Sequence, residues 1–378
     1  MDTKITKKRL NDHLSYDWIK YVAIFAVTIL LFWLLYDVGA TKPTNAQKLE
    51  IFVLNGTAND AKLEHFVEDL EKRMNGTDKR PVDDRGYEVF HKDEILEVVV
   101  SSFGNYTSDA QISQAVSVRM QGGQESDLIL MDYRTFHNFV QTWLVSIDDY
   151  EKALKEAIAT NWAIVKDYPD VPEGTDAGSI RKTLEKRLWK TISEEYDKFF
   201  VDETETVAQA DLEGISPDHP LYGKSAGDSC TRYEKYSYRH QKVLPESLDE
   251  WQRISDELQQ AVNSLDQNVA EDSEKYEEEK QKYEQAKQKF DAAYANLAKE
   301  EEKAWGLDVN RFDVTTVKSE WFQSNLSAKR LPWEPENKNE MPFAMGITNF
   351  GNVNGTTYFE LVKVFNFLID NYAKAKTV

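Results

Sequence analysis

The sequence predicts an α/β protein with one mainly parallel sheet, a long helical insertion and a single N-terminal transmembrane helix. Three observations lead to this prediction. Apolar runs alternate with amphipathic stretches across residues 48–147, which is typical of parallel strands covered by helices on both faces. The same alternation returns after residue 305, and one long apolar run lies near the N-terminus. With 41% hydrophobic residues, the 378-residue chain can form a packed core.

The apolar run at residues 18–36 is long enough to cross a membrane, which takes roughly 20 helical residues. Lys20 is its one charged residue, and Trp18 and Tyr36 place aromatic rings at its ends, where membrane interfaces favour them. The residues before it include four basic ones: Lys4, Lys7, Lys8 and Arg9. Because cytoplasmic flanks are rich in Lys and Arg, we expect a cytoplasmic tail at 1–17, a cell-membrane anchor at 18–36 and an extracytoplasmic remainder after a linker at 37–47.

A cleaved signal peptide is the alternative for the same region. Val38-Gly39-Ala40 resembles a small-residue cleavage site after the apolar run. Against cleavage, the uncharged run at 21–36 is longer than a typical signal core of roughly 7 to 15 residues, and Asp37 precedes the site. An uncleaved anchor and a cleaved signal peptide are both compatible with the sequence, and the length of the apolar run favours the anchor.

The first α/β block, residues 48–147, contains three predicted strands, each followed by a helix. The strands are the apolar runs at 49–54, 95–100 and 127–131. The helices are amphipathic, with apolar residues three and four positions apart. In chain order these residues are Leu63, Phe66, Leu70 and Met74; Ile112, Ala115, Val116 and Met120; and Phe136, Phe139, Val140 and Trp143.

Residues 148–304 are predicted to be an acidic helical insertion without a convincing strand. Apolar stripes at 180–199 and 248–269 predict two helices, and Pro and Gly residues at 214–230 predict a long surface loop between them. We expect the many charged residues of this insertion to form solvated helix faces.

Residues 247–303 contain neither Gly nor Pro and carry aromatic and apolar residues at seven-residue intervals. These are Tyr276, Tyr283, Phe290 and Leu297. A full coiled-coil heptad needs a second apolar position, and charged residues occupy it here, so a self-standing coiled coil stays open. An antiparallel hairpin that turns near 266–272 and one long helix both fit this pattern.

The C-terminal block, residues 305–378, contains a short apolar strand at 342–347 and a helix at 358–372 with a wide apolar face. Neither element is expected to be stable alone. We therefore expect the block to complete the sheet of residues 48–147.

Several segments resemble the first lobe of bacterial extracellular solute-binding proteins of ABC importers. They are KLEIFVLNGT, EILEVVVSSFG and QESDLILMDYRTFHNFVQTWLVSIDDY at the front, and WGLDVNRF, MPFAMGITNF and TTYFELVKVFNFLIDNY at the back. Gly122-Gly123, Asp127, Asp132 and residues 144–150 stand where that family has a glycine-ended helix, an aspartate-containing segment and an "LDDY"-like phrase. The resemblance implies a ligand-binding lobe outside the cytoplasm.

The resemblance also implies a second α/β lobe, since that family traps ligand in a cleft between two lobes that hinge shut. Here the corresponding interval, 148–304, is helical and acidic. The sequence therefore predicts a single lobe with a helical insertion, and leaves open whether the insertion forms a second lobe.

Ligand in a parallel α/β lobe is expected beyond the carboxyl ends of the strands. The candidate ligand-binding residues at these ends are Asn55, Gly56, Ser101, Phe103, Asp132 and Tyr133, and Trp333 lies in a Pro-flanked loop near the last strand. Polar groups beside aromatic rings suit a sugar or a peptide. The competing interpretation is that these are ordinary turn and cap residues and that Trp333 packs its loop onto the lobe.

Composition and motifs exclude several classes of function. The histidines are dispersed without metal-ligand spacing, and nucleophile-elbow, P-loop and dinucleotide motifs are absent, so no enzyme, metal or cofactor is expected. A net charge of −20 argues against nucleic acid as a partner. Cys230 is the only cysteine, so no intramolecular disulfide can form.

Two functions are compatible with these features of the sequence. The first is a membrane-anchored solute-binding protein that binds or senses a saccharide or peptide for an ABC-type importer, with the importer permease or another membrane protein as its partner. The alternative is an envelope scaffold that contacts a membrane partner through its helical insertion and keeps a degenerate binding lobe.

Overall fold

The computed structural model describes residues 7–39, 43–44, 47–54, 56–57, 60–75, 81–84, 86, 88–89, 91, 94–103, 114–118, 126–169, 176–213, 215–266, 274–311, 323–324, 343–349 and 356–373. The chain divides into two compact units, Met1–Thr44 and Asn45–Val378.

The first unit consists of one helix, α1 (Lys7–Gly39), which contains the apolar run of the predicted anchor. Its large apolar side chains between residues 18 and 33, such as Phe25 and Trp33, are exposed. Within the described part of the chain, no helix has both the length and the apolar character needed to cross a membrane. The transmembrane helix at 18–36 stays a prediction.

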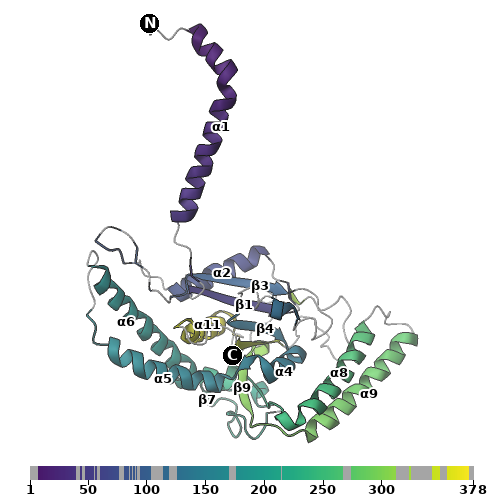
Figure 1. Ribbon diagram of the computed structural model, residues 1–378. Coiled ribbons are helices and arrows are strands. Elements are labelled where there is room, and N and C mark those ends of the chain that lie inside the picture. The colour runs from purple at the N-terminus through teal and green to yellow at the C-terminus, as the bar shows by residue number, and fades with distance from the viewer. Residues whose placement is uncertain are drawn as a thin grey trace. The chain divides into compact units, whose positions relative to one another are not determined.

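The second unit is built on one mixed sheet, in the strand order β3-β1-β4-β11-β9-β8, with the short strand β5 beside β11 (Figure 1). The strands are β1 (Lys48–Leu54), β3 (Glu97–Phe103), β4 (Leu128–Asp132), β5 (Leu144–Val145), β8 (Ser237–His240), β9 (Lys303–Asp308) and β11 (Phe343–Thr348). Short strands β2 (Gly56–Thr57) and β10 (Gln323–Ser324) pair separately, as do β6 (Glu205–Thr206) and β7 (Ser229–Cys230).

The α/β class is confirmed, but the sheet is only partly parallel. Strand β1 runs parallel to both β3 and β4, with Leu54 opposite Phe103 and Val53 opposite Leu130. Strands β11, β9 and β8 then add antiparallel pairs. An apolar run indicates that a strand is buried but not in which direction it runs, so the sequence pattern could not predict this reversal.

Helices cover both faces of the sheet, and the pleat of β1 distributes its side chains between them. Leu49, Ile51 and Val53 join one apolar cluster, whereas Phe52 and Leu54 join another, because successive strand residues point to opposite faces. The first cluster packs against α2 (Asp60–Asn75), α5 (Ile147–Val165), α6 (Ala177–Tyr196) and α11 (Thr356–Tyr372), and the second against α4 (Tyr133–Thr142). The C-terminal strand and helix thus belong to the same unit as the first block.

The insertion is not purely helical, which corrects the prediction for residues 148–304. Besides β6 and β7, it contributes β8 to the main sheet, and β9 begins at Lys303, inside the predicted boundary. The segment Ser-Tyr-Arg-His of β8 has no apolar run, and the sheet holds it through its pairing with β9 and through the Arg239–Glu302 ion pair at 3.2 Å. Short polar edge strands of this kind lack the pattern that reveals a strand.

The remaining elements are short helical turns and the caps of α5 and α6. The turns are η2 (Asp197–Val201), η3 (Gln209–Leu212), α7 (Arg232–Tyr236), η4 (Pro245–Ser247) and η5 (Val309–Arg311). Ser146 caps α5 by accepting a hydrogen bond from the backbone of Asp149, and Asp176 caps α6 in the same way. Residues 114–118 are helical, as the sequence predicts for that part of the second helix.

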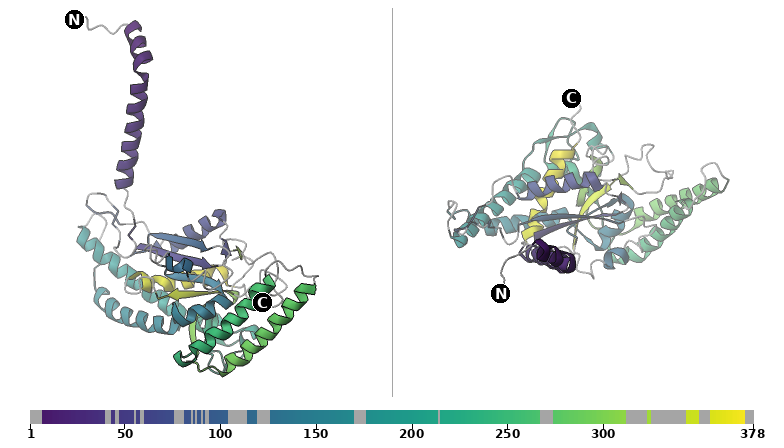
Figure 2. Two further views of the ribbon diagram at one scale, coloured as in Figure 1. Left: turned by 45° about the vertical axis from the view of Figure 1, so that its right-hand side comes forward. Right: turned by 90° about the horizontal axis from the view of Figure 1, so that it is seen from above.

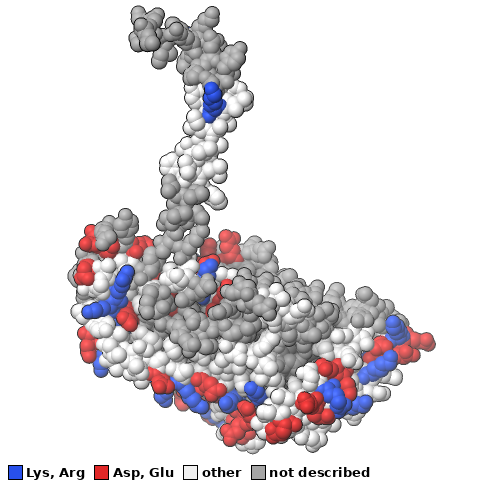
Figure 3. All heavy atoms as spheres, in the orientation of Figure 1, with Lys and Arg blue, Asp and Glu red and all other residues white. Residues whose placement is uncertain are grey.

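Helices α8 (Leu248–Asp266) and α9 (Glu274–Asn296) form an antiparallel pair, which decides between the two alternatives for this region. Trp251 near the start of α8 packs against Phe290 and Tyr294 near the end of α9, and Val262 packs against Tyr283. The seven-residue seam of α9 therefore faces α8. Figure 2 shows the pair at the opposite side of the unit from α5 and α6, and Figure 3 shows acidic and basic side chains interspersed on its outer surface.

Candidate functional site

The predicted ligand residues gather, by their backbone positions, at one edge of the sheet. Strands β1, β3 and β4 are parallel neighbours, so their carboxyl ends coincide. Ser101 and Phe103 lie in the last three residues of β3, Asp132 ends β4 and Tyr133 begins α4. Gly56 lies in β2, just beyond β1, and pairs with Ser324.

The side-chain geometry of this predicted site is not part of the described structure, apart from Ser101, which is half-buried. Asn55 and Trp333 lie outside the described residues altogether. The prediction of a ligand at the carboxyl edge therefore stays a prediction.

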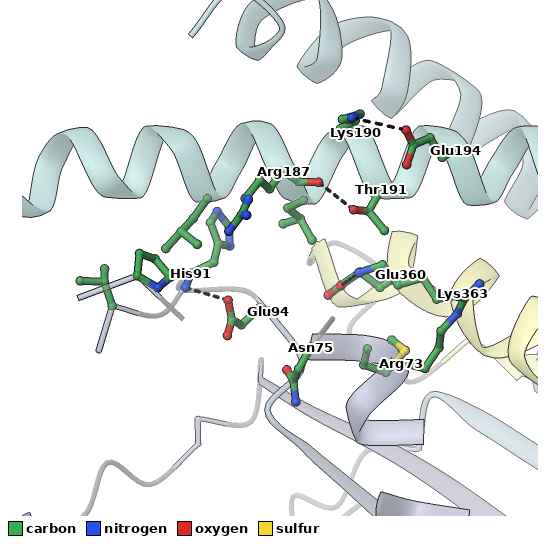
Figure 4. Close-up of a pocket in the computed structure, with 15 residues that line it drawn as sticks. Arg73, Asn75, His91, Glu94, Arg187, Lys190, Thr191, Glu194, Glu360 and Lys363 are labelled. Carbon is green, nitrogen blue, oxygen red and sulfur yellow. Dashed lines mark hydrogen bonds and ion pairs between the residues drawn. The ribbon is translucent and has the colours of Figure 1, made fainter. Parts of the chain in front are cut away.

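A cavity of about 370 Å³ lies in another place, near the amino end of β3. The end of α2, residues 81, 89, 91 and 94 before β3, and helices α6 and α11 line it (Figure 4). Its lining residues are Arg73, Met74, Asn75, Pro81, Val89, His91, Glu94, Leu184, Arg187, Leu188, Lys190, Thr191, Glu194, Glu360 and Lys363. These elements come together because β3 follows α2 in the chain while α11 packs against α2 in the core.

Helix α11 brings a polar stripe into this otherwise apolar region. Glu360, Lys363, Asn366 and Asp370 follow one another at intervals of three and four residues, which places them on one side of the helix. Glu360 and Asn366 are fully buried and Lys363 is nearly so. Charged side chains are rarely buried unless they are paired, so their partners decide what this stripe does.

The C-terminal part of this polar stripe, Asn366 and Asp370, forms hydrogen bonds and ion pairs with neighbouring elements. The Asn366 amide donates to the Glu195 carboxylate at 2.8 Å and accepts a hydrogen bond from Arg232 at 3.0 Å. Asp370 binds Lys198 at 2.6 Å and Arg232 at 2.8 Å. These contacts fix α11 to α6, η2 and α7.

The N-terminal part of the stripe, Glu360 and Lys363, lies beside the cavity, and one oxygen of Glu360 has no hydrogen-bond partner among the described residues. Lys363 Nζ lies 2.5 Å from Glu360 Oε1, whereas Glu360 Oε2 has no hydrogen-bond partner among the described residues. Burial raises the pKa of Glu360 above its ordinary value, and the nearby Lys363 ammonium opposes this rise. Glu360 is therefore a desolvated carboxyl group that lies behind the surface of the cavity and binds Lys363 through one of its oxygens.

Two further lining residues have a buried side-chain atom without a hydrogen-bond partner among the described residues. Five buried side-chain atoms of the described residues lack a hydrogen-bond partner, and three of them belong to residues that line this cavity: Arg73 Nε, Asn75 Oδ1 and Glu360 Oε2. Buried polar groups in proteins are nearly always hydrogen-bonded, to protein, water or ligand. These three atoms have almost no accessible surface, so they lie behind the surface of the cavity.

The charges around the cavity are nearly balanced, although the chain as a whole is strongly acidic. The lining contains four Lys or Arg residues and three Glu residues. Arg73 pairs with Glu195 at 2.5 Å and Lys190 with Glu194 at 3.7 Å. Such a lining suits a molecule that carries both donor and acceptor groups better than a polyanion.

The described residues contain no group of His, Cys, Asp and Glu side chains placed to hold a metal ion. Cys230 is buried, and burial raises the pKa of its thiol to about 11, so it is not a reactive thiolate near neutral pH.

Sequence reasoning missed the cavity because its residues come from four separate segments, and because Lys and Glu on helices are usually solvated. One signal was present. The apolar face of the last helix is interrupted by charged and amide residues at a helical interval, which is unusual for a helix that packs in a core.

A comparison of the chain with protein-family models, with curated proteins and with solved structures finds no match in any of the three.

Proposed function

We propose that this chain is a membrane-anchored extracytoplasmic protein that binds a small polar solute in the cavity between α2, α6 and α11. The observation that carries the proposal is a cavity of about 370 Å³ whose lining combines aliphatic side chains with four Lys or Arg and three Glu residues.

The size and composition of the cavity support the same proposal. Its volume of about 370 Å³ falls at the lower end of the range for small-molecule pockets, roughly 300–1,000 Å³. The lining combines aliphatic side chains, such as Leu184 and Leu188, with a few polar groups. This mixture is typical of binding sites for small molecules.

The location proposed for the protein rests on its N-terminal sequence. Residues 18–36 form an apolar run with Lys20 as the one charge, and basic residues precede it. A short linker at 37–47 would hold the binding unit near the membrane. The proposed partner is accordingly a neighbouring membrane protein, such as the permease of an ABC-type importer, and the proposed role is delivery or sensing of the solute.

The alternative, a scaffold that contacts its partner through the α8–α9 pair, has less support. The apolar seam of α9 packs against α8, so these side chains are in contact with α8 and are not available to a partner. Ion pairs such as Arg253–Glu257 at 2.6 Å cover the outer surface of α8. A solvated, internally paired surface offers few of the apolar anchors that dominate stable protein interfaces.

Ligand-induced stabilisation of the full chain in mild detergent tests the proposed function. We expect the melting temperature to rise with at least one member of a library of saccharides, amino acids and short peptides. Glu360→Gln should weaken this rise, and Glu257→Gln, an exposed change on α8, should leave it unchanged. The absence of any shift across the library would contradict the proposal.

A further inference from the structure

We infer that residues 215–228 form an acid-sensitive latch segment: protonation of His219 releases this segment from the apolar cluster that contains Cys230. The latch segment follows η3 and leads into β7, and it consists of turns without a helix or strand of its own. None of its residues lines the cavity, so the latch is independent of the solute proposed to bind there.

The imidazole of His219 holds the latch segment only in its neutral form. The backbone N–H of Leu221 donates a hydrogen bond to His219 Nδ1 at 3.1 Å. A backbone N–H can only donate, so Nδ1 carries no proton and the ring hydrogen lies on Nε2. Protonation of Nδ1 replaces this acceptor with a donor, so the hydrogen bond from Leu221 is lost.

Leu221 is the apolar anchor of the latch segment. Its side chain is fully buried and belongs to a small cluster with Val207 and Cys230, which are buried as well. This cluster is separate from the apolar clusters of the sheet. Because the backbone of Leu221 is the hydrogen-bond partner of His219, loss of that bond loosens the residue that packs in the same cluster as Cys230.

Polar contacts also attach the latch segment to its neighbours. Ser216 donates a hydrogen bond to Glu302 at 2.7 Å, and Lys224 binds Glu234 at 2.9 Å. Within 215–228, Leu221 is the only buried residue, and the others are half-buried or exposed. Segments with few buried apolar residues open locally at a lower cost in free energy than the core. The latch segment can therefore open while the sheet stays folded.

The surroundings of His219 oppose its protonation. Burial, followed by the guanidinium groups of Arg239 in β8 and Arg311 in η5, lowers the pKa of His219 from its ordinary 6.5 to about 4. The carboxylates of Glu302, just before β9, and Glu234 in α7 act in the opposite direction and are outweighed. Arg239 is fixed beside the latch segment by its ion pair with Glu302 at 3.2 Å. A proton on His219 therefore meets positive charge that cannot easily move away.

The lowered pKa of His219 sets the pH range in which the latch segment opens. When the segment opens, His219 returns to water and to its ordinary pKa, so the open form binds the proton first as the pH falls. The closed form is fully favoured above pH 6.5, and the open fraction rises up to ten-fold per pH unit from there to about 4. Ordinary carboxyl groups have pKa values of about 4 and titrate mainly below about pH 5, so the range above it reports on His219.

Thiol labelling of the full chain in mild detergent tests the inference, because Cys230 is the only cysteine and is fully buried. The reagent is 4,4′-dithiodipyridine, which reacts in acid as well as at neutral pH. The rate for the urea-unfolded chain at each pH corrects for the reactivity of the thiol itself. We expect the corrected rate to rise at least five-fold, and up to about 20-fold, between pH 7 and pH 5. Hydrogen exchange should rise over 215–228 in the same range while β1 stays protected.

His219→Gln is the matched variant, since an amide oxygen can accept the N–H of Leu221 but does not titrate. Its corrected labelling rate should stay constant within about two-fold from pH 7 to pH 5. The control His65→Gln, an exposed change on α2, should keep the rise of the unchanged protein. Circular dichroism and urea unfolding show whether each variant is folded, and the pH profile of the unchanged protein is a test even if one is not.

Three labelling outcomes would overturn the inference. The first is a corrected rate of the unchanged protein that does not vary between pH 7 and pH 5. The second is a rise that begins only below about pH 4.5, which would assign the opening to carboxyl groups. The third is a rise that persists in His219→Gln. Faster hydrogen exchange throughout the sheet would overturn it too, because the whole unit would then be unfolding.

Discussion

Gly306 and Gly346 lie directly opposite each other in β9 and β11, and the ring of Phe136 covers both. A Cβ atom added at Gly306 would lie 2.3 Å from the carbonyl oxygen of Met345 and 3.0 Å from the Phe136 ring. The three atoms nearest to a Cβ at Gly346 would all belong to side chains, those of Leu144 at 3.0 Å and Phe136 at 3.2 Å. The pair allows α4 to approach the antiparallel half of the sheet closely.

Replacing these glycines with alanine should therefore have unequal effects. Gly306→Ala should cost about 3 kcal/mol of unfolding free energy and Gly346→Ala about 1 kcal/mol, within the usual range for overpacking. Urea unfolding of the full chain in detergent measures both. Adding Phe136→Leu should partly rescue Gly346→Ala but not Gly306→Ala, because the clash at Gly306 is with backbone. Equal rescue of both variants would contradict this account.

The buried Glu360–Lys363 pair predicts a large difference between single and double changes. Lys363→Met leaves Glu360 without its cation and should cost about 3–5 kcal/mol, as is usual when one partner of a buried pair is removed. The double variant Glu360→Met with Lys363→Met should cost clearly less, because no buried charge remains. Urea unfolding at neutral pH is the measurement, and a double variant as unstable as the single one would contradict the prediction.

Glu360 also predicts a pH dependence of stability. Burial raises the pKa of Glu360 in the folded state, so its contribution is fully present below the ordinary carboxyl pKa. As the pH rises from there through the folded-state pKa, the unfolded chain releases this proton first and the free energy of unfolding falls. Glu360→Gln should remove that decline. Identical pH profiles for the variant and the unchanged protein would show that Glu360 is not the titrating group.

Asp370 should act in the opposite direction. Burial alone would raise its pKa, but the hydrogen bonds from Lys198 and Arg232 lower it below the ordinary value. Its contribution is therefore present above the ordinary carboxyl pKa and lost as the pH falls through the folded-state pKa. Asp370→Asn should cost about 1–3 kcal/mol at neutral pH and progressively less in acid. The exposed change Asp256→Asn serves as the control and should stay within about 0.5 kcal/mol of the unchanged protein at each pH.

Trp251 should be the main stabilising contact of the α8–α9 pair. It is 3% exposed and its ring lies 5.5 Å from Phe290 and 5.4 Å from Tyr294, centroid to centroid. Trp251→Ala should cost about 3–5 kcal/mol and speed hydrogen exchange in both helices. Leu248→Ala, on the same helix but 37% exposed, should cost much less. Unchanged exchange in α9 after Trp251→Ala would show that the pair does not depend on this contact.

The sequence alone predicted the elements whose signal is local. The runs at 49–54 and 127–131 became β1 and β4, each within one residue of the predicted bounds, and the terminal helix expected at 358–372 became α11, which begins two residues earlier and ends where predicted. The seven-residue seam predicted the contact surface of α9. These predictions succeed because the periodicity of a strand or helix depends on which of its faces is buried. The buried face can be recognised from the spacing of apolar residues within one short segment.

Tertiary structure decided the direction of β11, the recruitment of the polar strand β8 and the position of the cavity. Each depends on partners far away in the chain: Ser237 of β8 pairs with Leu307, and Arg73 of α2 binds Glu195 of α6. From sequence alone, a charged residue on a helix is predicted to be solvent-exposed, because the residues that surround it in the fold are not known. The polar stripe of α11 is buried because side chains from distant segments, such as Glu195 and Arg232, bind most of its polar groups.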